Sequence, residues 1–157
     1  MQKKITIVLF FFILTLSTSC GFKKINQDRP LIHLQKIEIN GENRIAYAIK
    51  NNIILLSNKD AVDKVNVRLD ILTSKSNKIK DKRGRVTRYT LKINGDLFLE
   101  NARTQETINK SFSKTVDYDT EQNYSNTINN EKNASKILVR QLSVEITNFI
   151  ILTFKTK

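Results

Sequence analysis

The apolar positions of this chain follow three spacings, and each spacing predicts a different kind of element. Near the N-terminus, residues 5–16 are apolar almost without interruption. Further along, four segments alternate apolar and polar residues, which is the spacing of a strand with one buried face. Two other segments place apolar residues three or four positions apart, as an amphipathic helix does. The patterns together predict the element order β-α-β-β-β-α.

The predicted strands cover residues 31–39, 65–71, 89–99 and 108–118. The first strand stops at Asn40-Gly41, a strong turn pair. Gly95 lies inside the third strand, where we expect a bulge or a kink. In the fourth strand, Lys110 and Lys114 fall on the same face as the apolar residues. We expect their long aliphatic stems to lie over apolar surface.

The helical spacing occurs over residues 43–57 and again over residues 124–153. Asn43 is the expected N-cap of the first helix, since Asn side chains readily accept hydrogen bonds from the first turn. The second helix ends in residues 149–152, which are apolar nearly all round. Such a segment needs to be covered, either by the sheet or by a partner. We expect the apolar stripes of both helices to cover one face of the sheet.

Composition and length exclude most familiar enzyme chemistry. The 157 residues fit a single domain, and they include one Cys, one His and four Gly. One Cys cannot form an intramolecular disulfide, and with a single His it cannot complete a Cys/His zinc site. A lone His33 in a predicted strand, without a Gly-x-Ser-x-Gly elbow, makes a catalytic triad a poor hypothesis. No Gly-rich phosphate loop is present. We therefore expect neither an enzyme nor a cofactor nor a metal site.

The N-terminus has the features of an export signal. Lys3 and Lys4 precede the apolar run, whose twelve residues would span about 18 Å as a helix, short of the roughly 30 Å of a bilayer core. Small residues and then Cys20 follow, so that residues 16–20 resemble the bacterial lipobox. The predicted division is a lipoprotein signal peptide over 1–19, a lipidated tether over 20–30 and one domain over 31–157. The alternative is a buried structural Cys in an ordinary exported protein.

The residue after the cysteine bears on the destination of a lipoprotein. By resemblance to known lipoprotein sorting, an Asp after the Cys retains the protein in the inner membrane, whereas this chain has Gly21. We therefore expect a lipid anchor in the outer membrane, with the domain on the periplasmic side. An inner-membrane lipoprotein with the same anchor is the alternative.

Charge is concentrated in one segment. The chain has 27 Lys and Arg against 15 Asp and Glu, a net charge of +12, and part of this excess reflects a general enrichment in Lys. Residues 74–85 form a predicted basic connection between strands. The candidate ligand-binding cations, offset only by Asp81, are Lys78, Lys80, Lys82, Arg83, Arg85 and Arg88.

This basic segment has two interpretations. It is either a solvated hairpin tip, whose charges prevent pairing between sheet edges, or a docking surface for phosphate groups. The predicted compartment excludes nucleic acid and makes lipopolysaccharide the abundant polyanion.

The whole exported part of the chain resembles the LptE family of lipopolysaccharide-assembly lipoproteins. The resemblance starts at Cys20-Gly21-Phe22 and continues through Arg44 and Asn51 in the first helix. In the second helix, the positions that match the family pattern are Tyr124, Ser125, Ala134, Leu138, Gln141, Leu142, Ile146, Ile150 and Leu152. Ile53 and Ile54 replace the usual Leu of the family.

The resemblance implies an α+β fold with two helices on one face of a four-stranded mixed sheet. It also implies a protein that sits inside an LptD-type β-barrel, assists assembly of that barrel and helps deliver lipopolysaccharide to the cell surface. No known ligand site of the family matches by motif, so the basic segment is a hypothesis from the residues alone. The other function classes left open are an auxiliary subunit of an ABC-type transport system and an activator of cell-wall synthases.

Overall fold

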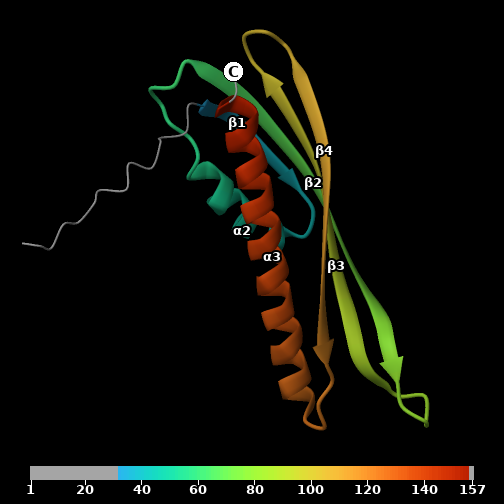
Figure 1. Ribbon diagram of the computed structural model, residues 1–157. Helices are drawn as coiled ribbons and strands as arrows, with labels where there is room; N and C mark the ends of the chain where they lie inside the picture. The colour runs from blue at the N-terminus through green and yellow to red at the C-terminus, as the bar shows by residue number, and fades with distance from the viewer. Residues whose placement is uncertain (1–31, 156–157) are drawn as a thin grey trace, which may run out of the picture.

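The computed structural model describes residues 32–155, which form one four-stranded sheet and two helices (Figure 1). The predicted signal peptide, Cys20 and the predicted tether lie outside the described residues. In chain order the elements are β1 (Ile32–Asn40), α2 (Asn43–Ile54), β2 (Asp63–Lys80), β3 (Val86–Asn101), β4 (Thr107–Asp119) and α3 (Tyr124–Lys155). The strands are ordered β1-β2-β3-β4, with β1 parallel to β2 and the other pairs antiparallel. The predicted element order and the mixed α+β sheet are confirmed.

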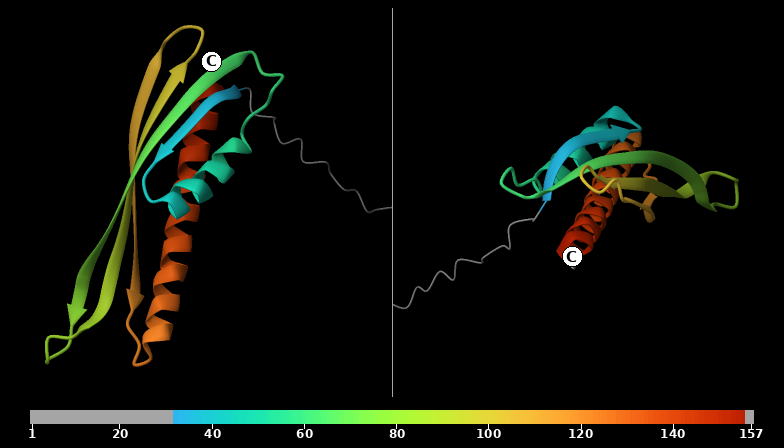
Figure 2. Two further views of the ribbon diagram at one scale, coloured as in Figure 1. Left: turned by 180° about the vertical axis from the view of Figure 1, so that it is seen from behind. Right: turned by 90° about the horizontal axis from the view of Figure 1, so that it is seen from above.

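Both helices cover the same face of the sheet, as Figure 2 shows from two directions. The helix α3 packs along β4 and β3, while α2 packs on β1 and against α3. The alternation of β2 and β3 follows from this arrangement, because every second side chain turns toward the helices. The fully buried side chains of the core come from both layers and include Ile49, Ile53, Val65, Leu69, Ile93, Leu97, Leu142, Ile146 and Ile150.

The helix α3 is long and apolar enough to cross a membrane by length and composition alone, with a mean hydropathy of 1.5 over its most apolar window. Its position in the fold explains this composition. Residues spaced as one stripe along it, Leu138, Leu142, Ile146 and Ile150, are buried against the sheet. The last turn is covered in part, because Ile150 is fully buried while Leu152 is 62% exposed.

The long hairpin of β2 and β3 differs from the sequence expectation. We predicted a basic connection over residues 74–85, but β2 continues as strand to Lys80 and the turn comprises only residues 81–85. Beyond Asp70, β2 has no pairing with β1. From Leu72 to Lys80 every residue of β2 is exposed, so nothing requires these residues to alternate. This part of β2 is a strand because its backbone pairs with β3. Its residues do not alternate, so the sequence did not indicate a strand here.

Gly95 is a second correction, since it lies in regular register between Ile71 of β2 and Phe112 of β4. Its role is to leave room for the helix. A Cβ at this position would lie 3.3 Å from Leu69 Cδ1 and 3.4 Å from Leu142 Cδ2. The glycine therefore marks close packing between the sheet and α3, and not a bulge.

The helix boundaries also differ slightly from those predicted. The N-cap of α2 is Glu42, without a side-chain capping hydrogen bond, and Asn43 is the first helical residue. The helix ends at Ile54, where residue 57 was expected.

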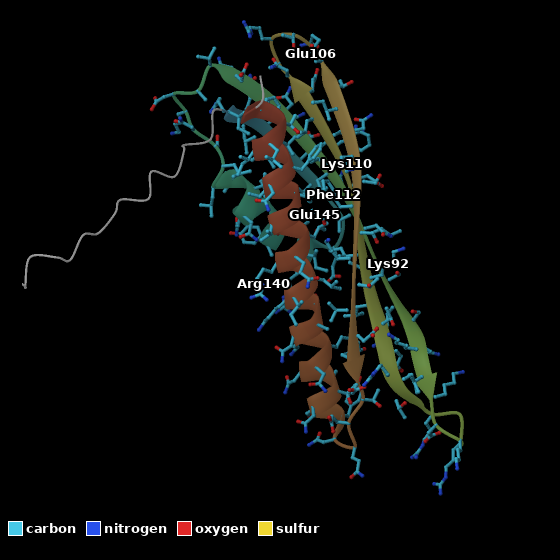
Figure 3. All side chains as sticks on the ribbon, viewed as in Figure 1. Lys92, Glu106, Lys110, Phe112, Arg140 and Glu145 are labelled. Carbon is cyan, nitrogen blue, oxygen red and sulfur yellow. The ribbon has the colours of Figure 1, made fainter. Side chains whose placement is uncertain are left out.

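The two lysines of β4 that share a face with apolar residues behave differently. The Nζ of Lys114 is 2.6 Å from Oε2 of Glu145, which is on α3 and faces the sheet beside Phe112 of β4 (Figure 3). Lys110 is exposed. The ion pair with Glu145 of α3 therefore explains why a lysine can occupy the covered face of β4. The spacing of residues along the sequence gives no sign of this pair.

Candidate functional site: the basic hairpin and the adjoining groove

The tip of the β2–β3 hairpin is organised by one carboxylate. Asp81 Oδ1 accepts hydrogen bonds from the backbone N–H of Arg83 at 2.8 Å and of Arg85 at 2.9 Å. Its Oδ2 accepts a third hydrogen bond from Arg85 Nε, also at 2.8 Å. The backbone and side-chain hydrogen bonds from Arg85 hold the pKa of Asp81 below its usual value. Gly84 supplies the positive φ of 78° that the tight turn requires.

Two of the predicted ligand-binding cations are neutralised by strand β4. Lys78 forms an ion pair with Asp117, which also accepts a hydrogen bond from Thr90 Oγ1 at 2.7 Å. Arg88 makes a two-pronged contact with Asp119, with Nε–Oδ1 and Nη2–Oδ2 distances of 2.5 and 3.0 Å. Hydrogen bonds from these cations lower the pKa of Asp117 and of Asp119. The pairs are exposed, so they contribute more to side-chain order than to stability.

The six predicted cations thus divide into two groups of three. Arg85 is paired with Asp81, and Lys78 and Arg88 are paired with β4. Lys80, Lys82 and Arg83 are exposed, and within residues 32–155 no carboxylate lies within ion-pair distance of them. We call these three residues the tip cations. They are the part of the predicted site that remains available to an anionic ligand.

The sequence hypothesis missed the carboxylates of β4 because it considered only neighbours along the chain. Asp117 and Asp119 are 39 and 31 residues away from their partners. Their alternation at the end of the last strand is the one signal that could have indicated them, since alternate residues share a face.

A groove of about 900 Å³ opens on the helix-covered side of the sheet, between α2, the first half of α3 and the strands β2 and β3. Its floor includes Leu91 and Ile93 of β3, and its wall is the first half of α3, with Ile128 and Val139. The helix α2 lines the groove from Arg44 to Asn52. The cations that line it on the two helices are Arg44, Lys132, Lys136 and Arg140. It therefore combines apolar surface with positive charge.

A polar cluster joins the sheet to α3 beside this groove. Glu131 Oε2 accepts hydrogen bonds from Lys75 Nζ and from the Tyr118 hydroxyl, each at 2.7 Å. Tyr89 stacks on Tyr118 with ring centroids 5.5 Å apart, and Lys75 Nζ lies 4.3 Å from the centroid of Tyr89. The hydrogen bond from Lys75 lowers the pKa of Glu131. Burial acts against the charge of Lys75, but its hydrogen bonds to Glu131 and Tyr118 outweigh this, and its pKa is raised.

This cluster predicts a pH dependence of stability. A carboxyl whose pKa is lower in the folded state stabilises the fold above its unfolded pKa, here near 4.5, and this contribution is lost as the pH falls through the folded pKa. Glu131→Gln should therefore lower the melting temperature at pH 7 and have a smaller effect at pH 3. The check is thermal unfolding of both proteins across that range, with Glu121→Gln, an exposed carboxylate before α3, as the control.

The remaining sequence candidates are placed as follows. His33 lies in β1 opposite Lys64 of β2. Within residues 32–155 no three His, Cys, Asp or Glu side chains are grouped so that they could hold a metal ion.

Comparison with known proteins gives a similarity in fold. No protein-family model and no curated protein matches the sequence. A solved structure from Caulobacter crescentus CB15, described as that of a lipoprotein, superposes with a TM-score of 0.53 at 15% identity, covering 76% of this chain and 90% of that chain. Rare lipoprotein B from Shewanella oneidensis superposes with a TM-score of 0.51 at 13% identity, covering 77% and 94%. At these identities the likeness establishes a shared fold.

Proposed function

We propose that this chain is an outer-membrane lipoprotein, anchored through Cys20, that supports an LptD-type β-barrel in the delivery of lipopolysaccharide to the cell surface. The observation that carries the proposal is the shared fold with two lipoproteins, one of them rare lipoprotein B, in a chain whose own N-terminus has a lipobox. The two lines of support are independent, because one is a likeness of fold and the other is a short motif in the sequence.

Lipidation explains the single cysteine. A thioether-linked diacylglycerol together with an N-terminal acyl chain gives three hydrocarbon chains, and each buried methylene contributes about 0.8 kcal/mol to membrane binding. Such an anchor holds the domain at the membrane permanently. A barrel partner in the same membrane then meets the domain at high local concentration.

The anchor is tested by Cys20→Ser. Cells labelled with radioactive palmitate should incorporate label into the parent chain and none into the variant, and the variant should leave the membrane fraction. Globomycin, which blocks lipoprotein signal peptidase, should make the parent precursor accumulate. The matched control is Gly21→Asp, which should keep the label and move the chain to the inner membrane. A Cys20→Ser chain that is processed normally and still fractionates with the outer membrane would contradict the proposal.

The tip cations are the proposed contact with lipopolysaccharide phosphates or with an acidic lumen of the barrel. Arg and Lys side chains match phosphate oxygens well, and those of the tip have no internal carboxylate to compete. Such contacts weaken in salt, because the screening length falls from about 10 Å at 0.1 M to about 3 Å at 1 M.

The triple variant Lys80→Glu, Lys82→Glu and Arg83→Glu should fold normally and lose binding. Because the tip cations form no internal ion pair, we expect the melting temperature to stay within a few degrees of the parent value. Lipopolysaccharide binding and co-purification of the barrel should fall at least about tenfold, which corresponds to roughly 1.4 kcal/mol. The control makes the same change of charge at the exposed residues Lys50, Lys59 and Lys110. Equal losses in both variants would mean that only net charge matters.

A further inference from the structure

We propose that the outer edge of β2 over residues 72–80, together with the groove beside it, receives an extended acidic segment of a protein partner as a fifth strand. The occupant takes the place in the sheet where β1 would lie if it were longer. This proposal concerns the strand edge and the groove, which adjoin the tip cations at Lys80. It stands whether or not Cys20 is lipidated.

The edge of β2 is free because β1 stops halfway along it. The last pair of β1 and β2 is Asn40 with Asp70, and Gly41 then turns the chain away directly beside Ile71. From Ile71 to Lys80, β2 pairs with β3 on its other side. Ile71 itself still lies against Gly41. From Leu72 to Lys80, the only strand of residues 32–155 that pairs with β2 is β3. The result is a nine-residue strand edge whose outward N–H and C=O groups are available to a further strand.

Both faces of an added strand would meet apolar surface. Side chains turned toward the helices enter the groove over Leu91 and Ile93. Those turned the other way reach Leu72 and Ile79, which are 67% and 46% exposed. The register places Leu72 beside Asn94 and Ile79 beside Arg88, so both lie on the face away from the helices. An occupant can therefore bury apolar side chains on either face.

The charges around the edge select an acidic occupant. On the edge strand itself, Lys80 has no carboxylate at ion-pair distance within residues 32–155, whereas Lys75 and Lys78 are already paired with Glu131 and Asp117. The groove adds Lys132, Lys136 and Arg140 from α3, and within the described part of the chain these three have no carboxylate at ion-pair distance. The acidic residues that line the groove are Glu42 and Glu131, and the second is already engaged by Lys75.

Charge also decides between the possible occupants. Lysines on an edge strand normally prevent association between identical edges. A second copy of this chain would bring another edge with Lys75, Lys78 and Lys80 next to this one, and the like charges would repel. An acidic strand converts the same lysines into attractive contacts. A lipid phosphate could pair with the lysines, but it could not form hydrogen bonds along the backbone N–H and C=O groups of the β2 edge. The observations therefore favour a protein segment over a second copy or a lipid.

The probe is a fluorescent ten-residue peptide of alternating Val and Glu, with both termini blocked, added to the purified full-length chain. We expect saturable binding, and we expect the peptide of alternating Val and Lys to bind at least about tenfold more weakly. Hydrogen exchange of the protein should slow at residues 72–80 when the acidic peptide is bound, because pairing protects edge amides. The same peptide N-methylated at four consecutive central residues, which blocks both of its edges, should give no such protection.

The protein control is a pair of charge reversals on the groove wall. Lys132→Glu with Lys136→Glu should weaken binding at least about tenfold, while Lys50→Glu with Lys59→Glu should change it by less than about threefold. Three results would overturn the proposal. These are absence of binding at about 1 mM peptide, binding without protection of residues 72–80, and equal protection by phosphatidylglycerol vesicles.

Discussion

Leu142→Asp should abolish cooperative folding of the domain. Leu142 is fully buried in the stripe of α3, and its side chain reaches the space that Gly95 leaves open in β3. An Asp there loses the apolar contacts, creates a cavity and buries a carboxyl without a partner. We expect a cost of about 4 kcal/mol or more, against a total stability of about 5–15 kcal/mol for a domain of ordinary stability. Circular dichroism during thermal unfolding measures the effect.

The matched control for this substitution lies two residues further along the same helix. Val144 is 53% exposed, so Val144→Asp places the same charge in nearly the same helix position but in water. We expect it to change stability by about 0.5 kcal/mol or less. Ile146→Asp should repeat the result of Leu142→Asp, since Ile146 is also fully buried. If the Leu142 variant melted within a degree or two of the parent protein, α3 would not cover the sheet.

Gly41→Ala should be the most damaging of the small substitutions in the turns. Gly41 has a φ of 137°, and a Cβ added to it would lie 2.8 Å from the backbone oxygen of Ile71 and 3.0 Å from its Cβ. The obstacle is backbone, so it cannot move aside as the end of a flexible side chain would. We expect a loss of about 2–4 kcal/mol, measured as a lower midpoint in urea with an unchanged m-value.

Gly84→Ala separates the two causes of that loss. Gly84 also has a positive φ, of 78°, but no atom lies within 4 Å of the Cβ that would be added. The substitution therefore carries only the conformational cost, about 1 kcal/mol. If both variants lost the same stability, the contact between Gly41 and Ile71 would contribute nothing.

The parts of the fold that could be predicted from the sequence are those that depend on local spacing. Val65, Val67, Leu69 and Ile71 alternate because α2 and α3 cover one face of β2 there. The stripe of α3 was recognisable for the same reason. Beyond Ile71 the helices no longer bury one face of β2, so its residues do not alternate between apolar and polar. From the sequence we therefore interpreted this segment as a connection.

The candidate site was only half predictable. The clustering of Lys80, Lys82 and Arg83 is a property of the local sequence, and the structure keeps them together at the tip. The neutralisation of Lys78 by Asp117 depends on the register across three strands. That register includes irregularities on both sides of Ile79, whose positions no spacing of residues indicates. The groove depends on how α2 and α3 are placed on the sheet, which is also a property of packing and not of local sequence.

The position of α3 at the end of the chain has a consequence for the order in which the protein folds. Ribosomes and export machinery release a chain from its N-terminus, so all four strands emerge before the helix that covers β3 and β4. Until α3 has been made up to Phe154, near its end, the strand residues that it buries, such as Ile93 and Leu97, face water. Contacts such as that of Asn52 with Ser143 link residues 91 positions apart, and such distant contacts form late. Until the last helix docks, the newly made strands therefore expose apolar surface that favours aggregation.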